Sequence, residues 1–142
     1  MINKLFYTDN SKSTVLIRLM VGVVFLSEGI QKFLFPAIRG AGRFEKIGLP
    51  APELLGGLVG TTEVLCGLLI LLGLCTRLAS VPLIVIMVVA IATTKIDILT
   101  DKGLWEMMHG SRTDWSMILG SVFLLIRGAG YWSVDHKLNK RI

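Results

Sequence analysis

The stretch VLIRLMVGVVFLSEGIQKFLF, residues 15–35, decides the fold of this chain. It is apolar over enough length to cross a bilayer, which takes about 20 residues in a helix. It nevertheless contains three charged residues. Helical periodicity builds one face from Arg18, Gly22, Phe25, Gly29 and Lys32, with Glu28 beside it. Because charges at membrane depth are costly unless they are paired or turned inward, we expect this face to line a polar interior.

The composition also favours a membrane protein. The 142 residues form one domain by length, 53% of them are hydrophobic, and the mean hydropathy is +0.69. The net charge is +5, but the basic residues stand in short segments between apolar runs. This distribution is typical of contact with anionic lipid. Nucleic acid is not predicted as a partner, because its single-stranded forms need basic residues interleaved with aromatic ones.

The predicted fold is an all-α, integral membrane four-helix bundle in a single transmembrane domain, residues 1–142. Its apolar spans are expected at residues 14–35, 54–74, 78–96 and 114–128. Between the first two spans, residues 37–47 place basic side chains on one face and apolar side chains on the other. This pattern predicts a short interfacial amphipathic helix. Residues 98–113 are expected to form a polar loop.

An even number of spans places both termini on one side of the membrane. A modest excess of Lys and Arg flanks the spans on that side, which predicts that both termini are cytoplasmic. Arg18 lies within a turn of the same boundary, so we expect it to extend to the interface as an anchor. The first span is expected to be retained, because it is too long and too charged for a signal peptide.

Glu63 is the only charged residue of the second predicted span. It shares a helical face with three glycines, Gly56, Gly60 and Gly67. Glycines on one face of a membrane helix let another backbone approach closely. We therefore expect this face to pack against a neighbouring helix, with Glu63 inside the bundle.

Glu28, Lys32 and Glu63 are the candidate ligand-binding or proton-relay residues. The helical rise places Glu28 about 11 Å and Glu63 about 14 Å inside the same membrane face, so the three could cluster in the outer half of the bundle. Two carboxylates and one ammonium cannot all stay charged cheaply in a low dielectric, so we expect Glu63 to hold a proton near neutral pH. Such a group could bind a quinone carbonyl, relay a proton or orient a small anion. Alternatively, these charges only join two helices while Lys32 extends to the interface.

The order of these motifs and the residues in them resemble the DoxX family of small bacterial membrane proteins. The matching segments are RLMVGVVFLSEGIQK at residues 18–32, FEKIGLPAPE at 44–53, Glu63 with CGLLILLGLCTR at 66–77, and TDWSMILGSVFLLIRGAGYWSVD at 113–135. The resemblance covers nearly the whole chain. It implies a four-helix protein of the bacterial cell inner membrane. The family takes its name from a subunit of a thiosulfate:quinone oxidoreductase.

The sequence contains no self-contained catalytic or redox centre. His109 and His136 lie outside the predicted spans and are expected to be surface histidines. Cys66 and Cys75 are too far apart on one helix to form a disulfide and are expected to be free thiols. No motif for zinc, haem, an iron–sulfur cluster or a phosphate loop is present, so no metal is predicted. Redox chemistry would therefore pass through a bound quinone or through the cofactor of a partner protein.

Two functions of different classes follow. The first is an accessory subunit of a membrane redox system, which binds quinone or docks an oxidoreductase. The second is a non-enzymatic small transporter or a scaffold that assists the assembly of other membrane proteins. Four spans are few for a complete transport pathway, so a homo-oligomer is expected under the second function. The family resemblance favours the first.

Overall fold

The structure is a computed structural model, and it describes residues 7–140. This part of the chain contains helices and no strands, so the all-α prediction is confirmed. Its four long helices are α2 Thr14–Leu34, α4 Pro52–Leu72, α5 Thr76–Thr94 and α8 Arg112–Arg127. The shorter ones are α3 Ala41–Lys46, α6 Ile96–Lys102, α7 Leu104–Gly110 and α9 Val134–Asn139.

Three helical segments are long and apolar enough to cross a membrane. They are Thr14–Leu34, Pro52–Leu72 and the stretch Thr76–Lys102, which joins α5 to α6. The helix α8 has 16 residues, or about 24 Å of helix, against a hydrocarbon core of about 30 Å. The membrane-spanning character of the chain is confirmed, whereas the fourth span stays a prediction.

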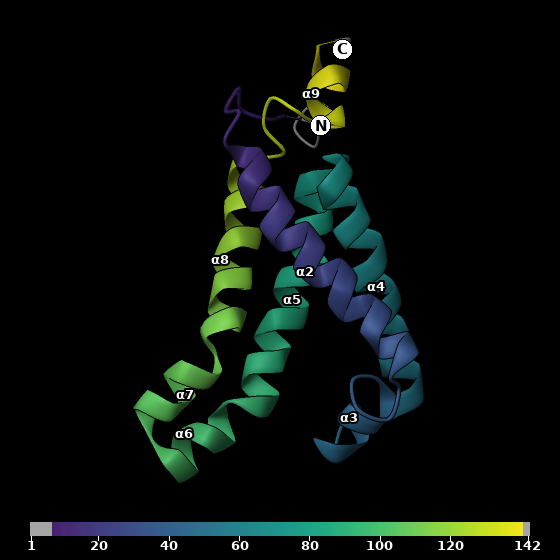
Figure 1. Cartoon of the computed structure of the whole chain (residues 1–142), viewed down its shortest axis with the longest axis vertical. Coiled ribbons are helices and arrows are strands. Elements are labelled where there is room, and N and C mark those ends of the chain that lie inside the picture. Colours follow the sequence, from purple (N-terminus) through teal and green to yellow (C-terminus); the bar gives the residue numbers. More distant parts are fainter. Residues whose placement is uncertain (1–6, 141–142) are drawn as a thin grey trace.

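The long helices form two pairs, α2 with α4 and α5 with α8 (Figure 1). The pairs meet near the end of the molecule that holds α9, and they diverge toward the end that holds α3, α6 and α7 (Figure 1). The buried apolar core takes residues from all four long helices, among them Val21, Ile70, Leu83 and Leu124. We call the end that holds α9 the closed end, and the end that holds α3, α6 and α7 the open end.

Glycines bring α2 and α4 together, as their spacing predicted. A Cβ added at Gly29 would lie 2.8 Å from the carbonyl oxygen of Gly60. A Cβ added at Gly67 would lie 3.0 Å from the carbonyl oxygen of Gly22. The first distance is too short for a real side chain and the second is tighter than most real contacts, so backbone packs directly on backbone along this seam.

Two connecting segments differ from their predicted bounds. The short helix between the first two spans is present as α3, but it is shorter than residues 37–47, because the chain first turns after Pro36 and α3 begins only at Ala41. The expected polar loop at residues 98–113 instead lies largely within α6, α7 and the start of α8, with Gly103 separating α6 from α7. Helices satisfy their own backbone hydrogen bonds, which matters for segments that lie against a membrane.

The first described residues pack against the segment that follows α8. Asp9 N donates to the carbonyl of Arg127 at 3.2 Å, and Tyr131 N donates to the carbonyl of Ser11 at 3.0 Å. The Arg127 guanidinium also pairs with Asp9 at 2.6 Å. These segments therefore lie together at the closed end (Figure 1).

Candidate functional site

Lys32 and Glu63 form an ion pair between α2 and α4. The Lys32 Nζ lies 2.6 Å from the Glu63 Oε2, and the two side chains are 11% and 4% exposed. Lys32 stands in the last turn of α2, and Glu63 stands near the middle of α4. The absence of a side chain at Gly60 lets Lys32 approach α4 closely, because a Cβ there would lie only 3.3 Å from the Lys32 Cβ.

The Lys32 ammonium points into the bundle toward Glu63, and its position relative to the membrane interface, one part of the alternative interpretation, stays a prediction. Side chains on a helix lean toward its N-terminus. On α2 this direction leads away from the open end and into the bundle, where Glu63 lies. The other part of the alternative, that the pair joins two helices, agrees with the contact.

Glu28 lies beside this pair without joining it. Its side chain is half-buried and forms no ion pair or hydrogen bond among residues 7–140. Besides Lys32, the charges that act on Glu63 are those of Glu28 and Arg43. The predicted neighbourhood of three residues thus contains one direct contact. Arg43, a residue of α3, was missed because its basic pattern indicated only contact with lipid.

Arg18 is buried at the closed end, so the prediction that it extends to the interface is wrong. It is 4% exposed. Its guanidinium donates to the carbonyls of Ile70 at 2.8 Å and Leu71 at 2.5 Å, near the C-terminus of α4. It also donates to the carbonyls of Ala129 at 3.3 Å and Trp132 at 2.5 Å. The last carbonyls of a helix lack partners within the helix, and arginine supplies enough donors to satisfy several of them.

Asp135 lies on the other side of the α4–α5 turn and is 2% exposed. Its carboxylate accepts from Cys75 N at 2.7 Å and from Thr76 N at 3.0 Å, at the N-terminus of α5. Burial raises the pKa of Asp135, and these hydrogen bonds and the charge of Arg18 only partly oppose that effect. Arg18 and Asp135 therefore complement the two helix ends that meet at this turn.

The two histidines differ. His109 is exposed, as predicted. His136 is only 8% exposed, so its prediction as a surface histidine is wrong. Its ring stacks on Tyr131 with centroids 4.6 Å apart, because α9 folds back onto the closed end. Ser133 accepts a hydrogen bond from His136 N and caps α9, and this serine was the one local signal for the helix.

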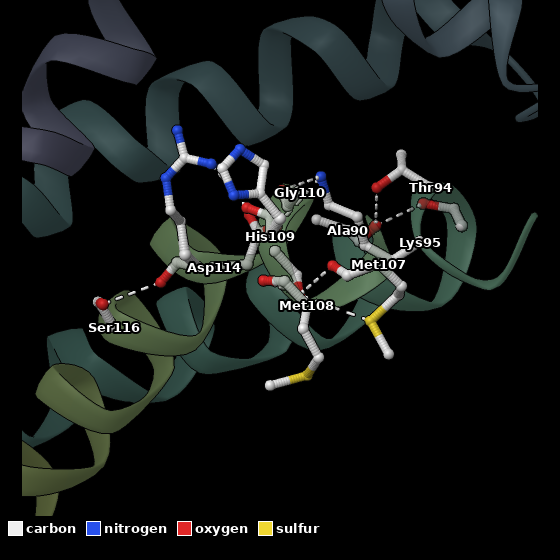
Figure 2. A network of polar contacts seen from close by, with 12 residues as sticks. Ala90, Thr94, Lys95, Met107, Met108, His109, Gly110, Asp114 and Ser116 are labelled. Atoms are coloured by element: carbon white, nitrogen blue, oxygen red, sulfur yellow. Dashed lines mark hydrogen bonds and ion pairs between the residues drawn. The ribbon is translucent and has the colours of Figure 1, made fainter. Parts of the chain in front are cut away.

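A third polar cluster ties α5 to the α7–α8 connection (Figure 2). The Lys95 Nζ lies 3.3 Å from the Asp114 Oδ2 and donates to the Gly110 carbonyl at 2.8 Å. Both charged side chains are partly exposed. Elsewhere, Cys66 and Cys75 are free thiols. Within residues 7–140, no three His, Cys, Asp or Glu side chains gather closely enough to hold a metal ion.

Comparison with known proteins assigns the chain to a family. The DoxX family model matches residues 13–96, which include α2 to α5 and the Lys32–Glu63 pair. The chain belongs to the DoxX family. It is 50% identical to "Uncharacterized membrane protein Rv3486" of Mycobacterium tuberculosis, over 97% of this chain and 88% of that protein.

A more distant relative of this DoxX protein is "Putative oxidoreductase CatD" of Bacillus subtilis. The two are 27% identical over 86% of this chain and 84% of the relative. No solved structure matches this chain.

Proposed function

We propose that this DoxX protein is an accessory subunit of a membrane redox system and that it binds a quinone at the Lys32–Glu63 pair. The observation that carries the proposal is a lysine and a glutamate 2.6 Å apart and nearly fully buried between two membrane-spanning helices. Ionisable groups inside a membrane are rare and are found at ligand sites and proton relays. The name of the relative CatD supports a redox setting.

The chemistry of the pair suits a quinone head. The Lys32 ammonium has three donors, and one of them is used by Glu63. A second donor could bind a quinone carbonyl, while the Glu63 carboxyl supplies or accepts a proton. Reduction of a quinone to a quinol takes up two electrons and two protons. In this proposal the two electrons come from a partner oxidoreductase, while the DoxX protein positions the quinone and passes the two protons from water through Glu63, one after the other.

The test is the quinone content of the purified protein. We expect quinone to co-purify with the wild type in mild detergents and to be detectable by absorbance and mass spectrometry. Glu63→Gln should lose most of it. Asp114→Asn is the matched control, since it removes a carboxylate charge from the Lys95 pair outside the site. If no mild detergent retains quinone and Glu63→Gln alters only stability, the pair is structural and the proposal is wrong.

We further propose that the protein lies in the bacterial inner membrane with both termini in the cytoplasm. The packing of residues 8–13 against the segment after α8 supports a common side for the two ends of the chain. Reporter fusions to both termini test this. A periplasmic signal from either fusion contradicts the proposed orientation.

Transport is the second candidate. The observation that favours it is the difference in burial between the spans: 33% of the apolar window is buried in α2 and in α4, but only 6% in the stretch Thr76–Lys102. That stretch leaves a long apolar surface which a second copy of the chain could cover, and a homo-oligomer could complete a pathway. A flux into proteoliposomes driven by a pH gradient, and abolished by Glu63→Gln, would favour transport over the redox role.

A further inference from the structure

We propose that the groove between α3 and the end of α5 binds the headgroup of an anionic phospholipid. The groove lies at the open end and has a volume of about 470 Å³. Volumes of about 300–1,000 Å³ are typical of small-molecule sites. The residues that matter here are Arg39, Arg43, Lys46, Ile38, Ile47 and Thr94. This site is separate from the Lys32–Glu63 pair and does not depend on the proposed redox role.

Three cations line the groove, and their charges are available to a ligand. Arg39, Arg43 and Lys46 are exposed, and none of them forms an ion pair or a side-chain hydrogen bond within residues 7–140. By contrast, Lys95 and Arg127 are each paired with an aspartate. Clustered lysine and arginine side chains next to membrane helices attract anionic lipid headgroups.

The helix α3 carries Arg43 and Lys46, and Arg39 lies in the turn just before it. The helix begins seven residues after the last residue of α2 and packs against the first turns of α4. Gly56 allows this contact, since a Cβ there would lie 2.9 Å from the Ala41 N. The α3 backbone therefore packs against the start of a membrane-spanning helix, where we expect the lipid headgroup region to begin.

The apolar residues of the groove distinguish a lipid from a soluble anion. Ile38, which is 70% exposed, and Ile47 stand beside the cations and offer a surface to acyl chains. Thr94 closes the groove on the α5 side, but its hydroxyl donates to the Ala90 carbonyl and leaves the binding to the cations. A headgroup with attached acyl chains satisfies both kinds of surface, whereas free phosphate satisfies only one.

A second groove provides the matched control. It lies at the closed end, has a volume of about 480 Å³, and is lined by Lys137 and Lys140. The Lys140 Nζ already lies over the Tyr131 ring, 5.6 Å from its centroid. Lys137→Gln with Lys140→Gln removes two positive charges, the same number as Arg39→Gln with Lys46→Gln. Arg43 stays unchanged in both, because its charge also acts on Glu63.

The experiment is native mass spectrometry of the detergent-solubilised chain with added phosphatidylglycerol or phosphatidylcholine. We expect the wild type and the Lys137/Lys140 variant to retain phosphatidylglycerol in preference to phosphatidylcholine. The Arg39/Lys46 variant should bind phosphatidylglycerol about tenfold more weakly. Equal losses in both double variants would overturn the proposal, and so would equal retention of both lipids by the wild type.

Two further measurements complete the test. Inorganic phosphate at millimolar concentration should leave the bound lipid in place, and full displacement would show a site for a soluble anion instead. If the Arg39/Lys46 variant fails to fold, the single variants Arg39→Gln and Lys46→Gln replace it. Each should weaken retention of phosphatidylglycerol with an unchanged melting temperature, and unaltered retention in both would overturn the proposal.

Discussion

The two buried charge clusters of this DoxX protein solve the same problem in different ways. At the closed end, Arg18 makes four hydrogen bonds to backbone carbonyls, so one of its five donors is unused. At the site between α2 and α4, Lys32 makes one hydrogen bond, to Glu63, within the described residues. A cation whose donors are nearly all used is a structural element, whereas a cation with two spare donors can still bind a ligand.

The comparison also separates what each cluster holds together. Arg18 connects the end of α4 to the segment before α9, and Asp135 caps α5 across the same turn. Lys32 and Glu63 connect only α2 and α4, which already touch through their glycines. Stability should therefore depend more on Arg18 than on the Lys32–Glu63 pair. The first two of the four predictions below test that difference, and the other two test the glycine seam and Asp135.

The largest effect is expected from Arg18→Gln. The change leaves buried carbonyls of α4 and of the segment before α9 without donors, and hydrogen bonds to charged groups contribute about 1.5–3 kcal/mol each. We expect a loss of roughly 4 kcal/mol or more, measured by denaturant unfolding in detergent. Arg112→Gln, at an exposed position that bonds one carbonyl, should cost far less. Similar losses in the two variants would mean that Arg18 is not structural.

The next largest effect is expected from Glu63→Leu, which leaves Lys32 buried without a partner. Breaking a buried pair from one side costs about 3–5 kcal/mol. The double variant Lys32→Met with Glu63→Leu should recover most of this loss, because an apolar pair of similar size replaces both charges. Unfolding curves of the three proteins measure the difference. A double variant as unstable as Glu63→Leu would show that the pair is needed for stability and not only for function.

A smaller effect is expected from Gly29→Ala. The added methyl group would meet the Gly60 carbonyl at 2.8 Å and push α2 away from α4, at a cost of about 1–3 kcal/mol. Gly57→Ala in α4 is the control, because nothing lies within 4 Å of its added Cβ. That control should be neutral or stabilising, since alanine favours a helix over glycine. Melting temperatures in detergent distinguish the two, and equal shifts would contradict the glycine seam.

The smallest effect concerns pH. Because the pKa of Asp135 is raised in the fold above its ordinary value of 3.8, the folded state binds more protons than the unfolded state just above that pH. The contribution of Asp135 to stability is therefore greatest below pH 3.8 and decreases as pH rises through its folded pKa. The unfolding free energy of the wild type minus that of Asp135→Asn should decrease as pH rises from 3.8 through the folded pKa of Asp135. A difference that rises with pH would contradict the burial of the charged form.

Local sequence pattern was sufficient for features that repeat along one helix. The glycine and charge spacing in α2 and α4 predicted which faces are buried, and the helical rise placed Glu28 and Glu63 at similar depth, with Lys32 close enough to join them. The prediction held because helical periodicity and rise turn spacing directly into direction and depth. That Glu28, Lys32 and Glu63 bind a ligand or relay a proton stays a prediction.

What the sequence determined by itself is the all-α membrane character and the buried faces of its first two spans. Only the tertiary structure decided the roles of Arg18, Asp135 and His136, and the approach of Arg43 to Glu63. Arg18 meets Ala129 across 111 positions of the chain, and Asp135 meets Cys75 across 60. No local period encodes such contacts, because they arise only when helix ends from distant segments meet and need partners for their unpaired backbone groups.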